Sequence, residues 1–293
     1  MTTQARIDLV AQASEDLGRL EDAAIASIEL MIDRNLVALE RRLSEIYRRV
    51  QREGVALSAR SMASAILEEL GASAYLLSPA DLEQIYEDLI RQSQEAGIEG
   101  AIALIALLSI QPSDTDLPVA NPSEPVERLR GWGVAFRSGL VAILTMAFTT
   151  GWGVRRMLTQ AREEAGKLKG RAEQSVRTTS VEVWNDAADR QYQEVEIPYE
   201  QLVTAEDERV CPYCAARNMN IYRRGQISVP LHNWCRCLLV PVMDLPDNDR
   251  TATAYRESRL RGLKRSGQRP NYGASPAERR TGLDRAPSPV WTP

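Results

Sequence analysis

The feature that most constrains the fold of this chain is the clustering of its cysteines and its histidine. The chain of 293 residues contains four cysteines and one histidine, and all five lie within the 27 residues from 211 to 237. Two cysteines form a Cys-Pro-Tyr-Cys pair, and eighteen residues later a His-Asn-Trp-Cys-Arg-Cys segment begins. Five potential metal ligands in two short segments predict that the chain folds back to bring these segments together.

The spacing of these side chains is typical of a zinc site. Two intervening residues let both sulfurs of Cys211 and Cys214 face one ion, and His232 and Cys235 repeat that spacing. We predict one zinc ion per chain, with Cys235 or Cys237 as the fourth ligand. The alternatives are unligated or disulfide-bonded cysteines, or a catalytic Cys–His pair. The polar N-terminus without a signal segment predicts synthesis in the cytoplasm, which favours metal over cystine.

Most of the chain before this cluster has a helical pattern. Alanine, leucine, glutamate and arginine are abundant, and only 5% of the residues are aromatic. Residues 5–52 predict one long helix with a seam of apolar side chains, which either faces a bundle core or forms an intermolecular coiled coil. The seam consists of Ile25, Ile32, Leu36, Leu39, Leu43, Ile46 and Val50. Further helices are predicted over residues 58–70, 79–96, 98–110, 154–168 and 171–193.

Residues 132–154 are apolar apart from Arg137 and several serines and threonines. Their length would suffice for a membrane span. Against a span stand two Gly-Trp-Gly triplets, which would interrupt it, and Arg137, because a charge near the centre of a bilayer costs about 2.5 kcal/mol or more. We expect a buried helix, in a helical domain or against a partner, and no contact with a membrane.

Beyond residue 194 the pattern changes to short β-prone runs separated by turns. These runs cover residues 195–197, 202–204, 220–222 and 237–242. The sequence therefore predicts an α+β protein that is mainly α. The predicted parts are a helical region (1–110), a Pro-rich linker (111–125), a central helical region (126–194), a small mixed zinc-knuckle module (195–246) and an extended flexible tail (247–293). We expect the module to need its metal to fold, and the helices not to depend on the metal site.

The tail differs in charge from the rest of the chain. Residues 247–293 carry a net charge of +5, whereas residues 1–246 carry −9. A basic arm on an acidic body predicts binding to an acidic surface, with a protein favoured over DNA because arms that bind DNA are usually denser in charge. The alternative is a solvated tail that binds nothing. Arginine side chains can make bidentate contacts to carboxylates or phosphates, and a tryptophan side chain can anchor the arm on a partner. The candidate partner-binding residues are Arg256, Arg259, Arg261, Lys264, Arg265 and Trp291.

Two segments around the cysteines carry a specific resemblance. Residues 204–215 read TAEDERVCPYCA, and residues 230–241 read PLHNWCRCLLVP. Together they resemble the signature of the phage head morphogenesis family, the Mu F-like minor head proteins, in which D-x-x-V-C-P-x-C is followed by a short strand and P-L-H-P-N-C-R-C. Arg177-Thr178 also lies where the family has an Arg-Thr-Glu motif, with Thr179 in place of the glutamate. The resemblance covers about residues 130–243.

The resemblance implies a structural protein of the virion. Proteins of this family act in head assembly beside the portal vertex, and several bind the portal protein and influence DNA packaging or ejection. For this chain it implies a minor capsid protein, made in the host cytoplasm and located in the head near the portal vertex in multiple copies. Its implied partners are the portal protein, the major capsid protein, or both, with packaged DNA as a further candidate.

Two other classes of function are less compatible with the sequence. A phosphate-binding GxxxxGK[ST] loop does not occur, so the chain is not the packaging ATPase, and we expect no enzymatic activity. The alternative to a capsid role is a zinc-containing regulator that binds nucleic acid. Residues 195–246 lack the dense stripe of lysine and arginine that an independent DNA-binding domain would need.

Overall fold

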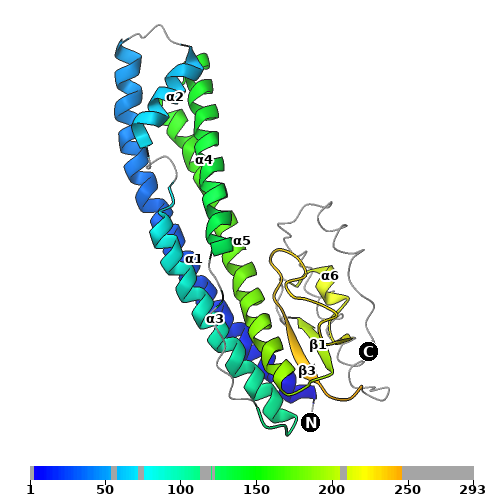
Figure 1. The fold of residues 1–293 in the computed structure, drawn as a ribbon. Coiled ribbons are helices and arrows are strands. Elements are labelled where there is room, and N and C mark those ends of the chain that lie inside the picture. Colours follow the sequence, from blue (N-terminus) through cyan, green and yellow to red (C-terminus); the bar gives the residue numbers. More distant parts are fainter. Residues whose placement is uncertain are drawn as a thin grey trace. The chain divides into compact units, whose positions relative to one another are not determined.

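The chain is α+β and mainly α, as predicted. The computed structural model describes residues 3–53, 58–71, 76–112, 120, 123–204 and 210–245. The helices are α1 (Thr3–Glu53), α2 (Ala59–Leu70), α3 (Pro79–Leu107), α4 (Ser123–Thr150), α5 (Val154–Glu194) and the short α6 (Pro212–Ala215) (Figure 1). The strands are β1 (Tyr199–Thr204), β2 (Ile221–Arg223) and β3 (Cys237–Val242). The tail with its candidate binding residues Arg256, Arg259, Arg261, Lys264, Arg265 and Trp291 lies outside the described residues.

The chain divides into two compact units, each assembled from segments that are not consecutive. Unit 1 contains Met1–Glu21, Leu89–Ala120 and Arg177–Pro293, and unit 2 contains Asp22–Asp88 and Asn121–Val176. Helices α1, α3 and α5 contribute residues to both units. The units are thus a different division of the chain from the five linear segments that the sequence predicts, because the sequence pattern changes along the chain and does not reveal which distant segments pack together.

Unit 2 is helical, and its core takes up much of the predicted seam of α1. Ile32, Leu39, Leu43 and Ile46 are all buried, which agrees with a core-facing bundle helix. Helix α2 packs against α4. The hydroxyl of Tyr47 also donates a hydrogen bond to a backbone carbonyl beyond the end of α4, at 2.8 Å.

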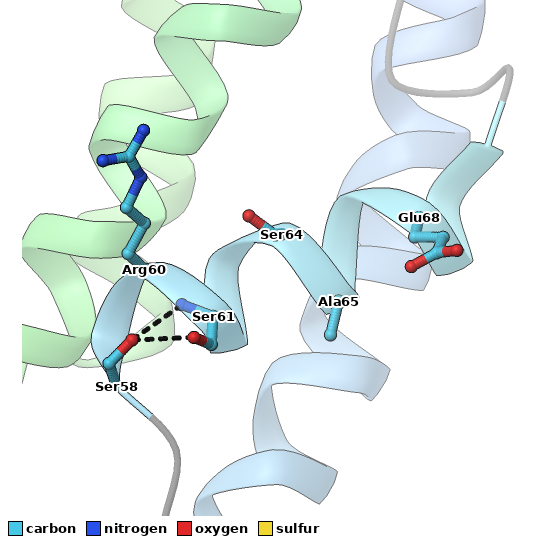
Figure 2. Close-up of a pocket in the computed structure, with 6 residues that line it drawn as sticks. All are labelled: Ser58, Arg60, Ser61, Ser64, Ala65 and Glu68. Atoms are coloured by element: carbon cyan, nitrogen blue, oxygen red, sulfur yellow. Dashed lines mark hydrogen bonds between the residues drawn. The ribbon is translucent and has the colours of Figure 1, made fainter.

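Helix α2 lies where the sequence predicts a helix over residues 58–70. Ser58 is the N-cap, and its side chain accepts a hydrogen bond from the backbone N–H of Ser61 at 3.1 Å. Gly71 ends the helix with φ +55°, a conformation that glycine adopts without steric cost. An open pocket on this helix is lined by Ser58, Arg60, Ser61, Ser64, Ala65 and Glu68 (Figure 2). Five of these six side chains are polar or charged, which is typical of a solvated surface.

Helix α4 contains most of the apolar stretch. Its first Gly-Trp-Gly triplet is helical, whereas Gly151 of the second has φ +69° and ends the helix, with the N–H of Trp152 bonded to the carbonyl of Ala147 at 2.9 Å. Among the described residues, α4 is the one helix long and apolar enough to cross a membrane by length and composition. Its most apolar 18-residue window is 28% buried. One face, including Phe136 and Leu144, is nevertheless fully packed.

Helices α3 and α5 are each continuous where the sequence predicts two helices. The predicted break in α3 falls at Gly97, but this residue stays helical because it packs closely against another helix. A Cβ on Gly97 would lie 2.6 Å from the carbonyl oxygen of Trp184, and a Cβ on Gly100 would lie 2.8 Å from the Trp184 ring. The predicted break in α5 falls at Gly170, which has open space around it and does not interrupt the helix. In α3, glycine therefore marks close packing, not a helix end.

Unit 1 contains an antiparallel sheet in the order β2-β1-β3. The predicted run 202–204 lies in β1, and the predicted run 237–242 coincides with β3. The predicted strand at residues 195–197 is wrong, because these residues close helix α5. The N–H of Ile197 bonds the carbonyl of Tyr192, the N–H of Glu196 bonds that of Gln193, and Glu196 has φ 55°, which is the Schellman pattern of a helix end.

The hydrophobic core of unit 1 joins the sheet to the helices. Val10 and Leu17 of α1, Leu104 of α3 and Trp184 of α5 belong to the same buried cluster as the strand residues and Cys235. The small sheet and the turn that contains Cys235 therefore share one core with these helices. Fifty residues bury too little apolar surface by themselves, and the helix ends supply the missing part of the core.

Candidate metal centre

The first pair of cysteines is positioned by α6. Cys211 is the N-cap of this short helix, and its sulfur accepts a hydrogen bond from the backbone N–H of Cys214 at 3.3 Å. Pro212 occupies the first turn, where a missing N–H has no cost. A single helical turn therefore brings the two sulfurs to one side of the backbone, with Cys214 buried and Cys211 half-buried.

The second segment is a tight turn that leads into β3. The N–H of Cys235 bonds the carbonyl of His232 at 3.0 Å, Trp234 has φ 68°, and Cys237 is the first residue of the strand. Nδ1 of His232 lies 2.5 Å from the carbonyl oxygen of Asn233. An N–H at Nδ1 would donate to this carbonyl and leave Nε2 able to bind a metal ion once its proton is displaced.

The two segments meet with their donor atoms in contact. Nε2 of His232 lies 3.0 Å from the sulfur of Cys211 and 3.1 Å from that of Cys214, and the sulfurs of Cys214 and Cys235 are 3.9 Å apart. Tetrahedral zinc with Zn–S bonds of about 2.3 Å places its sulfurs about 3.8 Å apart. The sulfur–sulfur separation fits such an ion, whereas the sulfur–nitrogen distances are those of hydrogen bonds and would lengthen on coordination.

All five residues predicted as ligands are brought together. They form two overlapping groups that could each hold a metal ion, one with Cys211, Cys214 and His232 and the other with Cys214, Cys235 and Cys237. Cys214 belongs to both groups, which makes it the centre of the cluster. The choice between Cys235 and Cys237 as a fourth ligand stays open, because both belong to the second group.

The four cysteines are free, so the disulfide alternative does not describe this structure. Hydrogen bonds with Cys214 lower the pKa of Cys211 to about 4 and the pKa of Cys235 well below its usual range. The same bonds raise the pKa of Cys214. Burial disfavours a charged His232, but its hydrogen bond to Cys211 and the charge of Cys235 outweigh burial and raise its pKa to about 9. The sulfurs therefore share protons that a metal ion would displace.

Contacts around the cluster fix its position on α5, and the sequence did not indicate them. The side-chain amide of Asn185 donates to the carbonyl of Cys237 at 3.2 Å, and its oxygen accepts from the N–H of Leu239 at 2.8 Å. Both bonds are buried and hold the start of β3 against the helix. An asparagine inside a predicted helix is too common a feature to have revealed this role.

Comparison of the chain with protein-family models, with curated proteins and with solved structures gave no match. The chemistry of the donor set is therefore the guide to the site. Three or four thiols with one imidazole form a soft set that suits zinc, and no carboxylate belongs to either group.

Proposed function

We propose that this chain is a minor head protein of a tailed phage, located at the portal vertex and acting in head assembly and in DNA packaging or ejection. The observation that carries the proposal is the meeting of residues 211–214 with residues 232–237 in one cluster of metal-binding side chains. These are the segments in which the sequence resembles the Mu F-like minor head proteins. The resemblance would have little weight if the two segments were far apart.

The metal centre in this proposal holds one zinc ion with a structural role. Cys211, Cys214, His232 and a fourth thiol would fill a tetrahedral shell, which leaves no position for a substrate or an activated water. Cys214, Cys235 and Cys237 are also buried. A filled shell with most of its thiols buried stabilises the fold and does not catalyse a reaction, so the proposal includes no enzymatic activity.

The zinc content of the protein tests the first half of the proposal. Chain purified under reducing conditions and without chelator should contain one zinc per molecule, and Cys214→Ser should lose most of it because Cys214 belongs to both ligand groups. Asn218→Ser, at a buried polar position between the two ligand segments, is a suitable control for the disturbance of a side chain. Protein without zinc, with its cysteines paired as cystine, would contradict the metal centre.

Binding to the portal protein tests the second half. Purified chain and its cognate portal protein should co-migrate on a sizing column, and phage heads should contain the chain in several copies. A chain that is absent from purified heads and does not bind the portal protein would contradict the capsid role while leaving the metal centre intact. Tight binding to duplex DNA in the absence of capsid proteins would favour the nucleic-acid-binding alternative.

A further inference from the structure

A buried cluster of charges joins helices α1 and α5 within unit 1. Glu21 of α1 is 1% exposed, and Arg177 of α5 is 8% exposed. Nη1 of Arg177 donates a hydrogen bond to Oε2 of Glu21 at 2.7 Å, and the hydroxyl of Ser180 donates to Oε1 at 2.6 Å. A buried ion pair is costly unless its hydrogen bonds are made, so the two helices are held in a specific register at this point.

Arg236 connects the metal centre to this cluster. It lies between Cys235 and Cys237, and a Cβ placed on Gly18 of α1 would lie 3.7 Å from its Nη2. Gly18 precedes Glu21 by three residues, so the two positions share a face of the helix. Burial raises the pKa of Glu21, whereas its hydrogen bond to Ser180 and the charges of Arg177 and Arg236 lower it. Arg236 is therefore close enough to stabilise the buried carboxylate.

The hydrophobic core reinforces this connection. Val10 and Leu17 of α1 belong to the same buried cluster as Cys235 and Cys237. The first part of α1 therefore shares one apolar core with the turn that contains Cys235, and the charge of Arg236 acts on Glu21. Both interactions require this turn to be ordered.

We propose that Arg236 couples metal loading to the docking of residues 3–21 of α1 in unit 1. An ion bound by Cys235 or Cys237 holds the backbone of Arg236 in place, and Arg236 then supports the buried Glu21. Without the ion the turn loosens, Glu21 loses one of its two cations, and the first part of α1 leaves the core. This inference rests on the metal centre of the proposed function and does not depend on the role in the virion.

Coupling of this kind is reciprocal. If metal binding favours the docked helix, then the docked helix must favour metal binding by the same factor. Docking of residues 3–21 thus raises the affinity for the metal, and metal binding in turn favours the docked state of these residues. The metal-free chain would present residues 3–21 undocked, and zinc uptake would complete unit 1.

The test compares Arg236→Met with a matched control in the same unit. Arg224→Met removes an arginine that also pairs with α5, through Asp189 at 3.3 Å. We expect Arg236→Met to weaken zinc binding about tenfold in competition with a chelator, as changes around metal ligands commonly do. Hydrogen exchange of residues 10–21 in the zinc-bound protein should also accelerate. Arg224→Met should change neither quantity.

Two further variants distinguish an effect of the Arg236 charge on Glu21 from a general loss of stability. Arg236→Lys keeps the charge and should restore part of the zinc affinity. Glu21→Gln should weaken zinc binding in the otherwise unchanged chain but add little to Arg236→Met, because both changes remove the same electrostatic interaction. Equal behaviour of Arg236→Met and Arg224→Met, or equal exchange of residues 10–21 with and without zinc in the unchanged chain, would overturn the coupling. An unchanged chain that binds no zinc would instead contradict the metal centre, and metal analysis detects this independently.

Discussion

Single glycines decide how closely two helices approach in unit 1. Gly97 and Gly100 of α3 face Trp184 of α5, which is buried and has no room to move. We expect Gly97→Ala and Gly100→Ala each to lower the free energy of unfolding by about 1 to 3 kcal/mol through overpacking. Gly170→Ala in α5 is the control, because its Cβ would meet open space and alanine favours helix by about 1 kcal/mol. Urea unfolding of the zinc-loaded proteins measures all three, and stabilisation by Gly97→Ala would show that the close approach is wrong.

The buried carboxyl group of Glu200 predicts a pH dependence of stability. Burial, followed by the nearby charge of Asp189, raises its pKa from 4.5 to about 8, although the N–H of Gly225 donates to it at 3.3 Å. The folded state therefore holds a proton that the unfolded state releases near pH 4.5. Stability from this group is complete below pH 4.5 and is lost as the pH rises through 8.

Glu200→Gln should remove this loss of stability. Glutamine keeps the shape and can still accept from Gly225, but it does not ionise. The stability of the variant relative to the original chain should increase from pH 5 to pH 9, by on the order of 5 kcal/mol at most, since one pKa unit corresponds to about 1.4 kcal/mol. Equal slopes of unfolding free energy against pH for the two proteins would contradict a buried, protonated Glu200.

At the scale of elements, the attachment of β3 to α5 depends on one side chain. Asn185 bonds the carbonyl of Cys237 and the N–H of Leu239, and all these groups are buried. Asn185→Ala leaves the two strand groups without partners, so we expect a loss of about 2 to 4 kcal/mol in unfolding free energy. Asn35→Ala, which removes a half-buried bond to the carbonyl of Leu76 in unit 2, should cost less. Thermal unfolding of both variants with zinc bound gives the comparison.

The elements also show where sequence patterns succeed and where they fail. The helix over residues 58–70, its end at Gly71 and the bounds of β3 follow from local preferences, and the structure agrees with them. The predicted strand at residues 195–197 and the predicted breaks in α3 and α5 are wrong. A run of β-prone residues can form the end of a helix, and a glycine can remain helical where another helix packs closely against it. Both outcomes depend on contacts with residues that are distant in the sequence.

At the scale of the whole molecule, the basic tail beyond Leu245 is expected to act as a binding arm. Truncation after Leu245 removes its excess of positive charge but none of the metal ligands. We expect incorporation into phage heads to fall severalfold while the zinc content stays at one per chain. Measurement of the chain in purified heads, alongside metal analysis, checks both. Normal incorporation and infectivity of the truncated chain would show that the tail has no part in the proposed function. DNA binding by the isolated tail that weakens steeply with salt would show that its partner is nucleic acid.

The sequence by itself determined the helical character of most of the chain, the position of the small sheet and the five metal-binding candidates. These features depend on local spacing and on residue type, which a linear pattern contains. Only the tertiary structure decided that Glu21 and Arg177 form a buried pair near the half-buried Arg236, and that the ends of α1, α3 and α5 complete the core around the turn that contains Cys235. Burial of a charge or of an apolar face depends on segments more than 150 residues apart in the chain, and no local preference determines which of them meet.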